Sequence, residues 1–173
     1  MDERVAYDED FYGWSQQQAA ALRDLARRRD LPNELDLEHV AEEIRDVGNA
    51  ELNSVRSFLR NVLAHVIKAA SSTRPELVAY WRREIVNFHL ELMGRYSASM
   101  RQNLDLQDLW ELAIRQAAAD LEVHGETVRP GLPARCPFGL DELVQRDFDP
   151  RAAISRLADL PGASMDGNGQ SPR

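Results

Sequence analysis

Residues 36–70 read DLEHVAEEIRDVGNAELNSVRSFLRNVLAHVIKAA, and this stretch decides the fold because it is the longest continuous helical pattern in the chain. Apolar residues recur within it at spacings of three and four, which is typical of one buried face of a helix. The residues of this face are Leu37, Val40, Ala41, Ile44, Val47, Leu52, Val55, Phe58, Leu59, Val62 and Val66. The spacing keeps its phase across Gly48, so the sequence predicts either one bent helix through Gly48 or two helices that share a buried side.

The segment before this stretch predicts a first helix at residues 8–29. Asp8 suits its N-cap, because a carboxylate there accepts hydrogen bonds from the free N–H groups of the first turn. Pro32 disfavours helix at the residue before it, so a break is expected at residues 30–33. The expected buried stripe of this helix comprises Phe11, Trp14, Ala21, Leu22 and Leu25.

Two more long helices are expected after residue 70. Pro75 suits the first position of a helix, since proline has no N–H to leave unsatisfied there. This helix is expected to run to about residue 100, or to end earlier at Gly94. Asn103 or Asp105 starts the next helix, whose apolar pattern ends by Gly125.

The rest of the chain predicts irregular structure with short helices. Residues 127–139 are rich in proline and glycine and should form a surface loop. A short helix is expected at residues 140–145. Asp149 and Pro150 form a cap and first-position pair, which predicts a last helix ending near residue 160.

Composition supports one helical domain. The chain has 173 residues, of which 43% are hydrophobic and 29% charged, as in ordinary globular proteins. No β-strand pattern competes with the helical ones. We therefore expect an all-α, single-domain helical bundle of about five main helices plus short C-terminal helices, at residues 1–160, followed by a disordered tail at residues 161–173.

Charge and cysteine content narrow the class of function. The net charge of −8 disfavours binding to nucleic acid, because phosphate contacts need clustered lysine and arginine. The single cysteine, Cys136, can form no internal disulfide, which fits a reducing compartment. No stretch approaches the roughly 20 apolar residues of a membrane span, and the acidic start does not resemble a signal peptide. A cytoplasmic protein with no membrane partner is expected.

Several short motifs follow one another in an order that is typical of one bacterial family. They are YDEDFYGW at residues 7–14, AEEI at residues 41–44, HVIK at residues 65–68 and CPF at residues 136–138. Through these motifs, residues 5–150 resemble the bacterial domain of unknown function family 29. The resemblance implies a compact, all-helical bacterial protein. It carries over no catalytic or ligand residues, because the family has none assigned.

Glu51 is the one chemical anomaly in the long stretch. It lies close to the middle of the apolar arc, where a buried carboxylate needs a partner. An arginine or tyrosine from another helix is expected to supply it, and Arg23, Arg82 and Tyr12 are the candidates. A structural contact between helices is the favoured interpretation.

Histidines near acids or lysine are further candidates. His39 and Glu43 share a helix face, as two metal ligands must. His65 lies on the apolar side with Lys68 nearly one turn further on. No Glu-x-x-His motif occurs at any of the four histidines, so the simple di-iron pattern is missing. For His39, Lys68 and Cys136 a structural role is preferred to a chemical one.

Three functions are compatible with these patterns. The favoured one is a non-enzymatic helical module that binds a protein partner or forms a homo-oligomer, without a cofactor. The first alternative is an enzyme or metal-binding bundle built from inward acids and histidines. Its candidate residues are Glu43, Glu51, His65 and His89. The second alternative is a nucleic-acid-associated regulator that uses the basic residues 27–29, Arg82 and Arg83.

Overall fold

The computed structural model describes residues 6–28 and 34–160 of the chain. These residues form seven helices and no strand, so the predicted all-α class is confirmed. The order is α1 (Phe11–Ala26), α2 (Leu37–Ser71), α3 (Pro75–Arg95), the 3-10 helix η1 (Ala98–Asn103), α4 (Leu106–Val123), α5 (Leu140–Leu143) and α6 (Pro150–Ala158). The expected break at residues 30–33, Arg29 and the tail at residues 161–173 lie outside the described residues.

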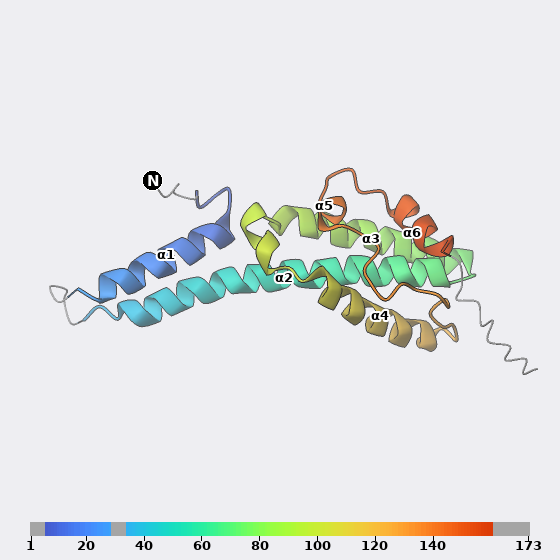
Figure 1. Cartoon of the computed structure of the whole chain (residues 1–173), viewed down its shortest axis with the longest axis horizontal. Coiled ribbons are helices and arrows are strands. Elements are labelled where there is room, and N and C mark those ends of the chain that lie inside the picture. The colour runs from blue at the N-terminus through green and yellow to red at the C-terminus, as the bar shows by residue number, and fades with distance from the viewer. Residues whose placement is uncertain (1–5, 29–33, 161–173) are drawn as a thin grey trace, which may run out of the picture.

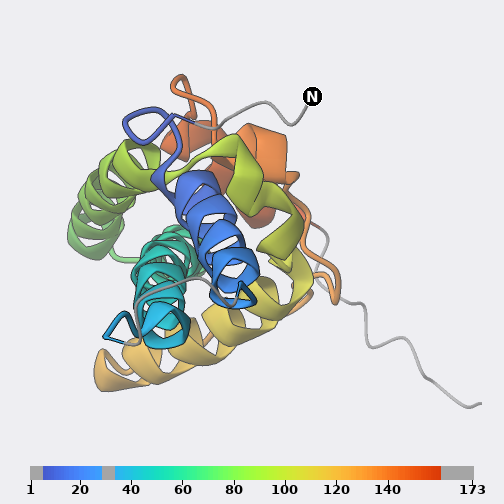
Figure 2. The same ribbon diagram turned by 90° about the vertical axis from the view of Figure 1, so that its left-hand side faces the viewer.

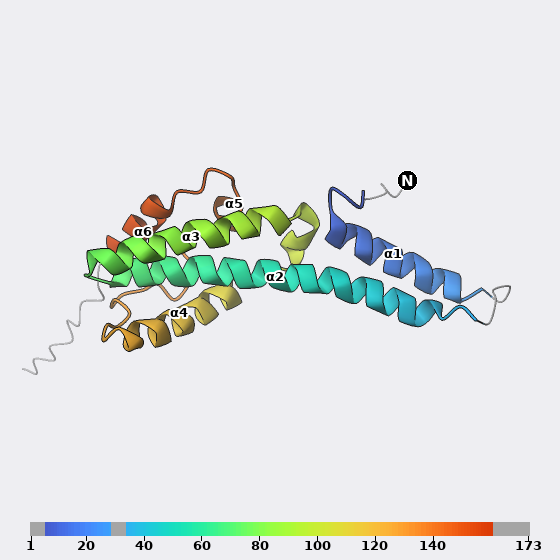
Figure 3. The same ribbon diagram turned by 180° about the vertical axis from the view of Figure 1, so that it is seen from behind.

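The long stretch forms one continuous helix. α2 has 35 residues and passes through Gly48 without interruption, so of the two alternatives the structure has the single helix. Asp36 caps it as predicted, because its side chain accepts a hydrogen bond from the backbone N–H of His39. Figure 1 shows that α2 runs the length of the molecule. Its first half pairs with α1, and its second half lies against α3, α4 and α6 (Figures 1 and 3).

Gly48 marks the closest approach of α1 to α2. A Cβ atom at this position would lie 1.9 Å from Oγ and 2.9 Å from Cβ of Ser15. Ser15 is itself buried, and its hydroxyl donates to the carbonyl oxygen of Tyr12 at 2.7 Å. A glycine inside a helix destabilises it by roughly 0.5–1 kcal/mol relative to alanine. The tight contact between the two helices explains why glycine is nevertheless required here.

The ends of α1 differ from the prediction. The N-cap is Asp10 and not Asp8, because the carboxylate of Asp10 accepts from the backbone N–H of Gly13 at 2.8 Å. The helix ends at Ala26, three residues before the predicted end at Arg29. Asp8 lies in the turn that precedes the helix.

The buried face of α1 is also different, so the predicted stripe is wrong. The side chains that face α2 include Tyr12, Ser15 and Ala19, which are all buried. Of the predicted stripe, Ala21 is exposed, and Phe11, Trp14, Leu22 and Leu25 are only half-buried. Phe11 and Trp14 instead form an aromatic cluster with Tyr7, whose ring centroid lies 5.3 Å and 4.8 Å from theirs.

The predicted starts of the later helices are confirmed, with one difference at an end. Pro75 is the first residue of α3, Asp105 caps α4 and Asp149 caps α6. α3 ends at Arg95, close to the earlier of the two expected ends and not near residue 100, because the chain turns there into η1. Gly94 is therefore the next-to-last residue of α3.

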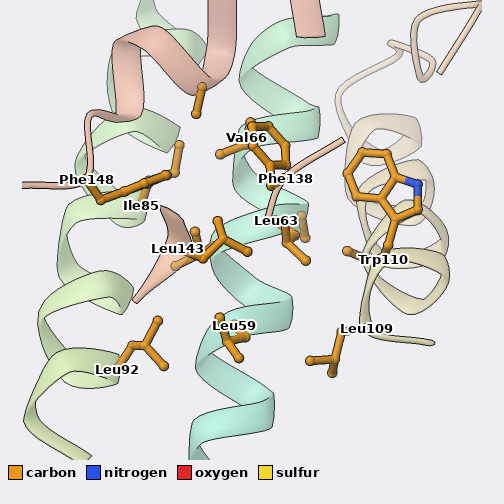
Figure 4. Close-up of a cluster of buried hydrophobic side chains, with 14 of the residues drawn as sticks. Leu59, Leu63, Val66, Ile85, Leu92, Leu109, Trp110, Phe138, Leu143 and Phe148 are labelled. Atoms are coloured by element: carbon orange, nitrogen blue, oxygen red, sulfur yellow. The ribbon is translucent and has the colours of Figure 1, made fainter. Parts of the chain in front are cut away.

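The main core surrounds the second half of α2. Every residue of α2 from position 62 to 69 is buried. Leucine and valine side chains of α2 meet side chains from α3, α4 and the C-terminal segment (Figure 4). These are Leu59, Leu63, Val66, Ile85, Leu92, Trp110, Phe138, Leu143 and Phe148. Each fully buried side chain of this size stabilises the fold by about 1.5–3 kcal/mol, so this end of the molecule holds most of the stability.

The first half of α2 is covered mainly on one side. Val40 and Val47, which the periodicity assigned to the buried face, are 46% and 53% exposed. Their exposure follows from the arrangement of the helices, because α1 packs against this half of α2 and the other helices gather along its second half (Figures 1 and 3). Seen from this end of the molecule, α1 lies along one side of α2 (Figure 2). One neighbouring helix covers a narrower arc than three do.

Candidate functional site

A groove lies where the start of α1 meets the middle of α2 and the end of α3. Its volume is about 510 Å³. We call it the aromatic groove, because four aromatic side chains are among its lining residues. These residues are Tyr7, Phe11, Tyr12 and Tyr96, and the lining is completed by Asp8, Glu9, Val47, Glu51, Gly94, Arg95, Ser97 and Met100.

Acidic side chains outnumber basic ones in the aromatic groove. Among the described residues that line it, Arg95 is the one cation, and it forms an ion pair with Glu51 at 3.4 Å. Asp8 and Glu9 are exposed, and their carboxylates make no hydrogen bond or ion pair with any described residue. The groove therefore has an excess of negative charge that its own residues leave unbalanced.

Asp10, which is not a lining residue itself, joins two of the segments that line the groove. Its carboxylate accepts from the hydroxyls of Ser97 and Ser99 at 2.7 and 2.8 Å, and also caps α1 through Gly13. Burial would raise the pKa of Asp10, but the hydrogen bonds from Gly13, Ser97 and Ser99 together outweigh it and hold that pKa below its ordinary value. A single ionised carboxylate thus ties the start of α1 to the turn after α3.

Glu51 has a partner from another helix, but not one of the expected ones. The partner is Arg95 of α3, so Arg23, Arg82 and Tyr12 were the wrong candidates. The Glu51 side chain is 36% exposed, because it lies in the wall of the groove and not inside the core. An exposed pair of this kind contributes on the order of 1 kcal/mol or less to stability.

His65 and Lys68 form a second polar cluster, together with Asp120 of α4. The Lys68 ammonium is almost fully buried, and it donates to Asp120 Oδ2 at 2.7 Å and to His65 Nε2 at 3.1 Å. His65 Nδ1 lies 2.7 Å from the carbonyl oxygen of Asn61. Because a carbonyl oxygen can only accept, Nδ1 carries the proton and Nε2 presents a lone pair to Lys68.

The surroundings of His65 keep it neutral. Burial lowers the pKa of His65, and the positive charge of Lys68 lowers it further. The Lys68 ammonium also lies 5.5 Å from the centroid of the Trp81 ring, which adds a cation–π contact. The cluster joins α2 to α3 and α4. His65 and Lys68 both have their hydrogen-bond partners within the protein, which supports a structural role for the two side chains.

The remaining candidates lie in separate surroundings. His89 is buried with its ring stacked on Phe148 at a centroid distance of 5.0 Å, and burial lowers its pKa. His39 is exposed beside Asp36 at the start of α2, with its Nδ1 2.6 Å from a carboxylate oxygen. Glu43 is exposed on the first half of α2. Cys136 is half-buried, and burial raises the pKa of its thiol, which disfavours the reactive thiolate.

No hydrogen bond or ion pair in the described part of the chain joins any two of the four residues named for a metal alternative, Glu43, Glu51, His65 and His89. Glu51 pairs with Arg95, His65 with Lys68, and His89 stacks on Phe148. Within residues 6–28 and 34–160, no three His, Cys, Asp or Glu side chains gather closely enough to hold a metal ion.

The two basic runs differ in their surroundings. Arg27 is the C-cap residue of α1, where a cation complements the negative end of the helix, and it also pairs with Asp24 at 3.2 Å. Arg82 and Arg83 of α3 line a second pocket together with Arg151.

The profile of the family described as "Domain of unknown function DUF29" matches residues 6–149, which is most of the chain. This chain belongs to the DUF29 family. The resemblance seen in the sequence motifs is thereby confirmed. No curated protein matches this DUF29 chain, and none of its described helices is both long and apolar enough to cross a membrane.

A solved structure is closely similar to this DUF29 protein. It is the crystal structure of an alpha-helical protein of unknown function from Rhodospirillum rubrum. The two chains are 39% identical, and the superposition has a TM-score of 0.84. It covers 90% of this chain and 99% of the other. The architecture described above is therefore shared with an experimentally determined structure, and neither comparison assigns a reaction to it.

The aromatic groove of this DUF29 chain was missed at the level of sequence. Three segments far apart in the chain line it: the residues before and at the start of α1, the middle of α2, and the turn from α3 into η1. Glu51 was the only signal of it in the sequence, as an acid that interrupts an apolar face. Tyr7 and Tyr96 could be recognised as lining residues only once the direction of the turn after α3 was known.

Proposed function

We propose that this DUF29 protein is a non-enzymatic interaction module, whose aromatic groove binds a segment of a partner protein that carries a lysine or arginine beside an apolar residue. The observation that carries the proposal is that the aromatic groove combines four aromatic side chains with the unpaired carboxylates of Asp8 and Glu9.

The chemistry of the lining selects a cationic side chain. The face of an aromatic ring attracts a cation within about 6 Å of its centre, and nearby carboxylates add a longer-range attraction. Arg95 is already paired with Glu51, so a second cation that enters the groove can pair with Asp8 or Glu9, whose carboxylates have no partner among the described residues. Tyrosine is also enriched in protein–protein interfaces, where its ring packs and its hydroxyl stays hydrated.

Exposed apolar residues continue from the groove along two helices. Val47 lines the groove, and Val40 lies two turns before it on α2. On α3, Leu90 is 65% exposed and lies one turn before Gly94, which also lines the groove. Single exposed apolar residues are common on protein surfaces. These are adjacent to the groove, so they would contact the apolar residues of a bound segment.

The groove can be blocked by one substitution. A Cβ at Gly94 would have no atom within 4 Å, so Gly94→Trp places a large side chain in the groove without a clash at its base. Gly139 is a matched control, because it too is open around its Cβ, has an ordinary negative φ of −85°, and lies outside the groove. Both variants gain the same side chain and keep the net charge.

The test uses two short capped peptides: one of lysine, leucine and alanine, and one with glutamate in place of each lysine. Binding is followed in the full chain by the NMR shifts of the Gly94 and Val47 amides, and in the Gly94→Trp variant by the Val47 amide. We expect the lysine peptide to shift both amides, Gly94→Trp to abolish binding, and Gly139→Trp to preserve it. Glu9→Gln should weaken binding several-fold, and added salt should do the same.

Three results would contradict the proposal. They are equal binding of the two peptides, undiminished binding to Gly94→Trp, and no shift of the groove amides at millimolar peptide concentration.

A further inference from the structure

A second concave site lies between the outer side of α3 and the start of α6, away from the aromatic groove. Its volume is about 270 Å³. We call it the arginine pocket, because Arg82, Arg83 and Arg151 are among its lining residues. The others are Ala79, Val86, Asp149 and Pro150.

The cations of the arginine pocket are largely without partners. The side chains of Arg82 and Arg151 make no hydrogen bond or ion pair with any described residue. Arg83 Nε lies 4.0 Å from a carboxylate oxygen of Glu84, which is the outer limit of an ion pair, and its guanidinium lies 5.5 Å from the centroid of the Tyr80 ring. The guanidinium groups of Arg82 and Arg151 are thus free to bind an anion, and Arg83 is held only by these two long contacts.

This positive charge is local to the pocket. The chain as a whole has a net charge of −8. Some arginines elsewhere, such as Arg101 and Arg156, are paired with carboxylates, whereas the pocket brings three arginines together with a single acid. The one acid of the pocket, Asp149, accepts a hydrogen bond from the backbone N–H of Arg151 at 2.8 Å as the N-cap of α6. The first turn of α6 adds the positive end of a helix dipole to the same place.

We infer that the arginine pocket binds the phosphate group of a small phosphate ester. The planar guanidinium presents two parallel N–H groups, which match two phosphate oxygens, and a phosphate dianion balances two such cations. The volume lies just below the range of about 300–1,000 Å³ for drug-sized ligands, so the pocket suits a small molecule. Ala79, Val86 and Pro150 supply an apolar wall for the organic part of the ester.

A nucleic acid fits this site less well than a small ester does. Binding of a nucleic-acid backbone needs a basic stripe that follows successive phosphates. The three arginines instead converge on one pocket of a protein whose net charge is strongly negative. An oligonucleotide therefore serves as a competing probe in the test.

The test is isothermal titration of the full chain at low ionic strength with phenyl phosphate, inorganic phosphate and a single-stranded oligonucleotide. The variants are Arg82→Gln and Arg151→Gln. Arg115→Gln is the matched control, because Arg115 is exposed on α4, lies outside the pocket, and its loss changes the net charge equally. Thermal melts establish that each variant is folded.

We expect saturable binding of phenyl phosphate, with weaker binding of inorganic phosphate because it has no apolar part. Each pocket variant should lose about tenfold or more in affinity, as a missing charge-assisted bidentate contact would cause, while Arg115→Gln should bind as the wild type does. The inference is overturned if phenyl phosphate does not bind at millimolar concentration, if Arg115→Gln loses as much affinity as the pocket variants, or if the oligonucleotide alone binds.

Discussion

At the scale of single residues, two glycines of the same fold should respond in opposite ways to alanine. In Gly48→Ala the new Cβ would meet Ser15 Oγ at 1.9 Å and Ser15 Cβ at 2.9 Å, so rotating the hydroxyl cannot relieve the clash. Overpacking of this kind costs about 1–3 kcal/mol, more than the roughly 0.5–1 kcal/mol by which alanine favours a helix over glycine. In Gly94→Ala nothing lies within 4 Å, so only the gain in helix propensity remains.

Urea denaturation followed by circular dichroism measures both effects. We expect Gly48→Ala to be less stable than the wild type and Gly94→Ala to be more stable by up to about 0.5 kcal/mol, since this glycine lies near a helix end. The double variant Ser15→Gly/Gly48→Ala, which moves the side chain from one helix to the other, should regain part of the loss. A Gly48→Ala protein as stable as the wild type would show that α1 does not pack as closely as described.

Also at the residue scale, His65 should make stability depend on pH. Its pKa is lowered in the folded protein from the ordinary value of 6.5, so below that pH the unfolded chain binds a proton that the folded chain does not. The contribution of His65 is therefore complete above pH 6.5 and declines as the pH falls. His89, whose pKa is lowered by burial, acts with the same sign. Exposed His39, whose pKa is raised beside Asp36, acts with the opposite sign.

Denaturation at a series of pH values between about 7 and 5 tests this. We expect the unfolding free energy of the wild type to fall over this range and to fall less steeply in His65→Gln, whose side-chain amide can still accept from Lys68 but does not titrate. His39→Gln is the control, and its decline should be no shallower than that of the wild type. An unchanged slope in His65→Gln would contradict the assigned neutral state of His65.

At the scale of elements, the sequence predicts where most helices begin better than where they end or which side of them is buried. Capping residues act within a few positions of the helix end, so Asp36, Pro75 and Asp149 predicted the starts of three helices correctly. For α4 the structure has Asp105, one of the two starts that the sequence allowed. The buried side depends on which helices pack against it. α1 meets α2 through Tyr12, Ser15 and Ala19, which are small or amphipathic residues. A search for the spacing of large apolar residues selects Phe11 and Trp14 instead. The same reasoning assigned Val40 and Val47 to the interior.

The continuity of α2 through Gly48 was likewise not determined by local preference. Glycine disfavours helix, and the pattern on either side of it was compatible with one helix or two. The deciding contact is the one with Ser15 of α1, which lies 33 positions earlier in the chain. A contact of this kind is tertiary, and it can outweigh the local propensity of one residue.

At the scale of the whole molecule, both candidate sites lie where elements distant in the sequence meet. The partner of Glu51 could be predicted by type, as an arginine or tyrosine from another helix, but Arg95 is positioned by the end of α3 and the turn into η1. Arg82 and Arg83 were recognised as basic residues, yet the third arginine of their pocket, Arg151, comes from the first turn of α6. Residue type can be read from a sequence, whereas the convergence of side chains on one cavity depends on packing.

The arrangement of the two ends of α2 predicts an uneven distribution of stability across the molecule. The second half of α2 lies in the main core, whereas the described contacts of α1 are chiefly with α2 and η1 (Figure 1). Segments with few buried apolar contacts open at a lower free energy than the core does. We therefore expect amide hydrogen exchange, followed by mass spectrometry, to be faster in α1 and in residues 37–47 than in residues 59–69.

Binding of the lysine peptide should slow exchange in α1, because the aromatic groove joins the start of α1 to α2 and α3. The Gly94→Trp variant should not show that slowing. Equal protection of α1 and residues 59–69 in the free protein would contradict this prediction, because it would mean that the two ends of α2 open together as one cooperative unit. A segment bound at the groove could then slow amide exchange in α1 only by stabilising the entire fold.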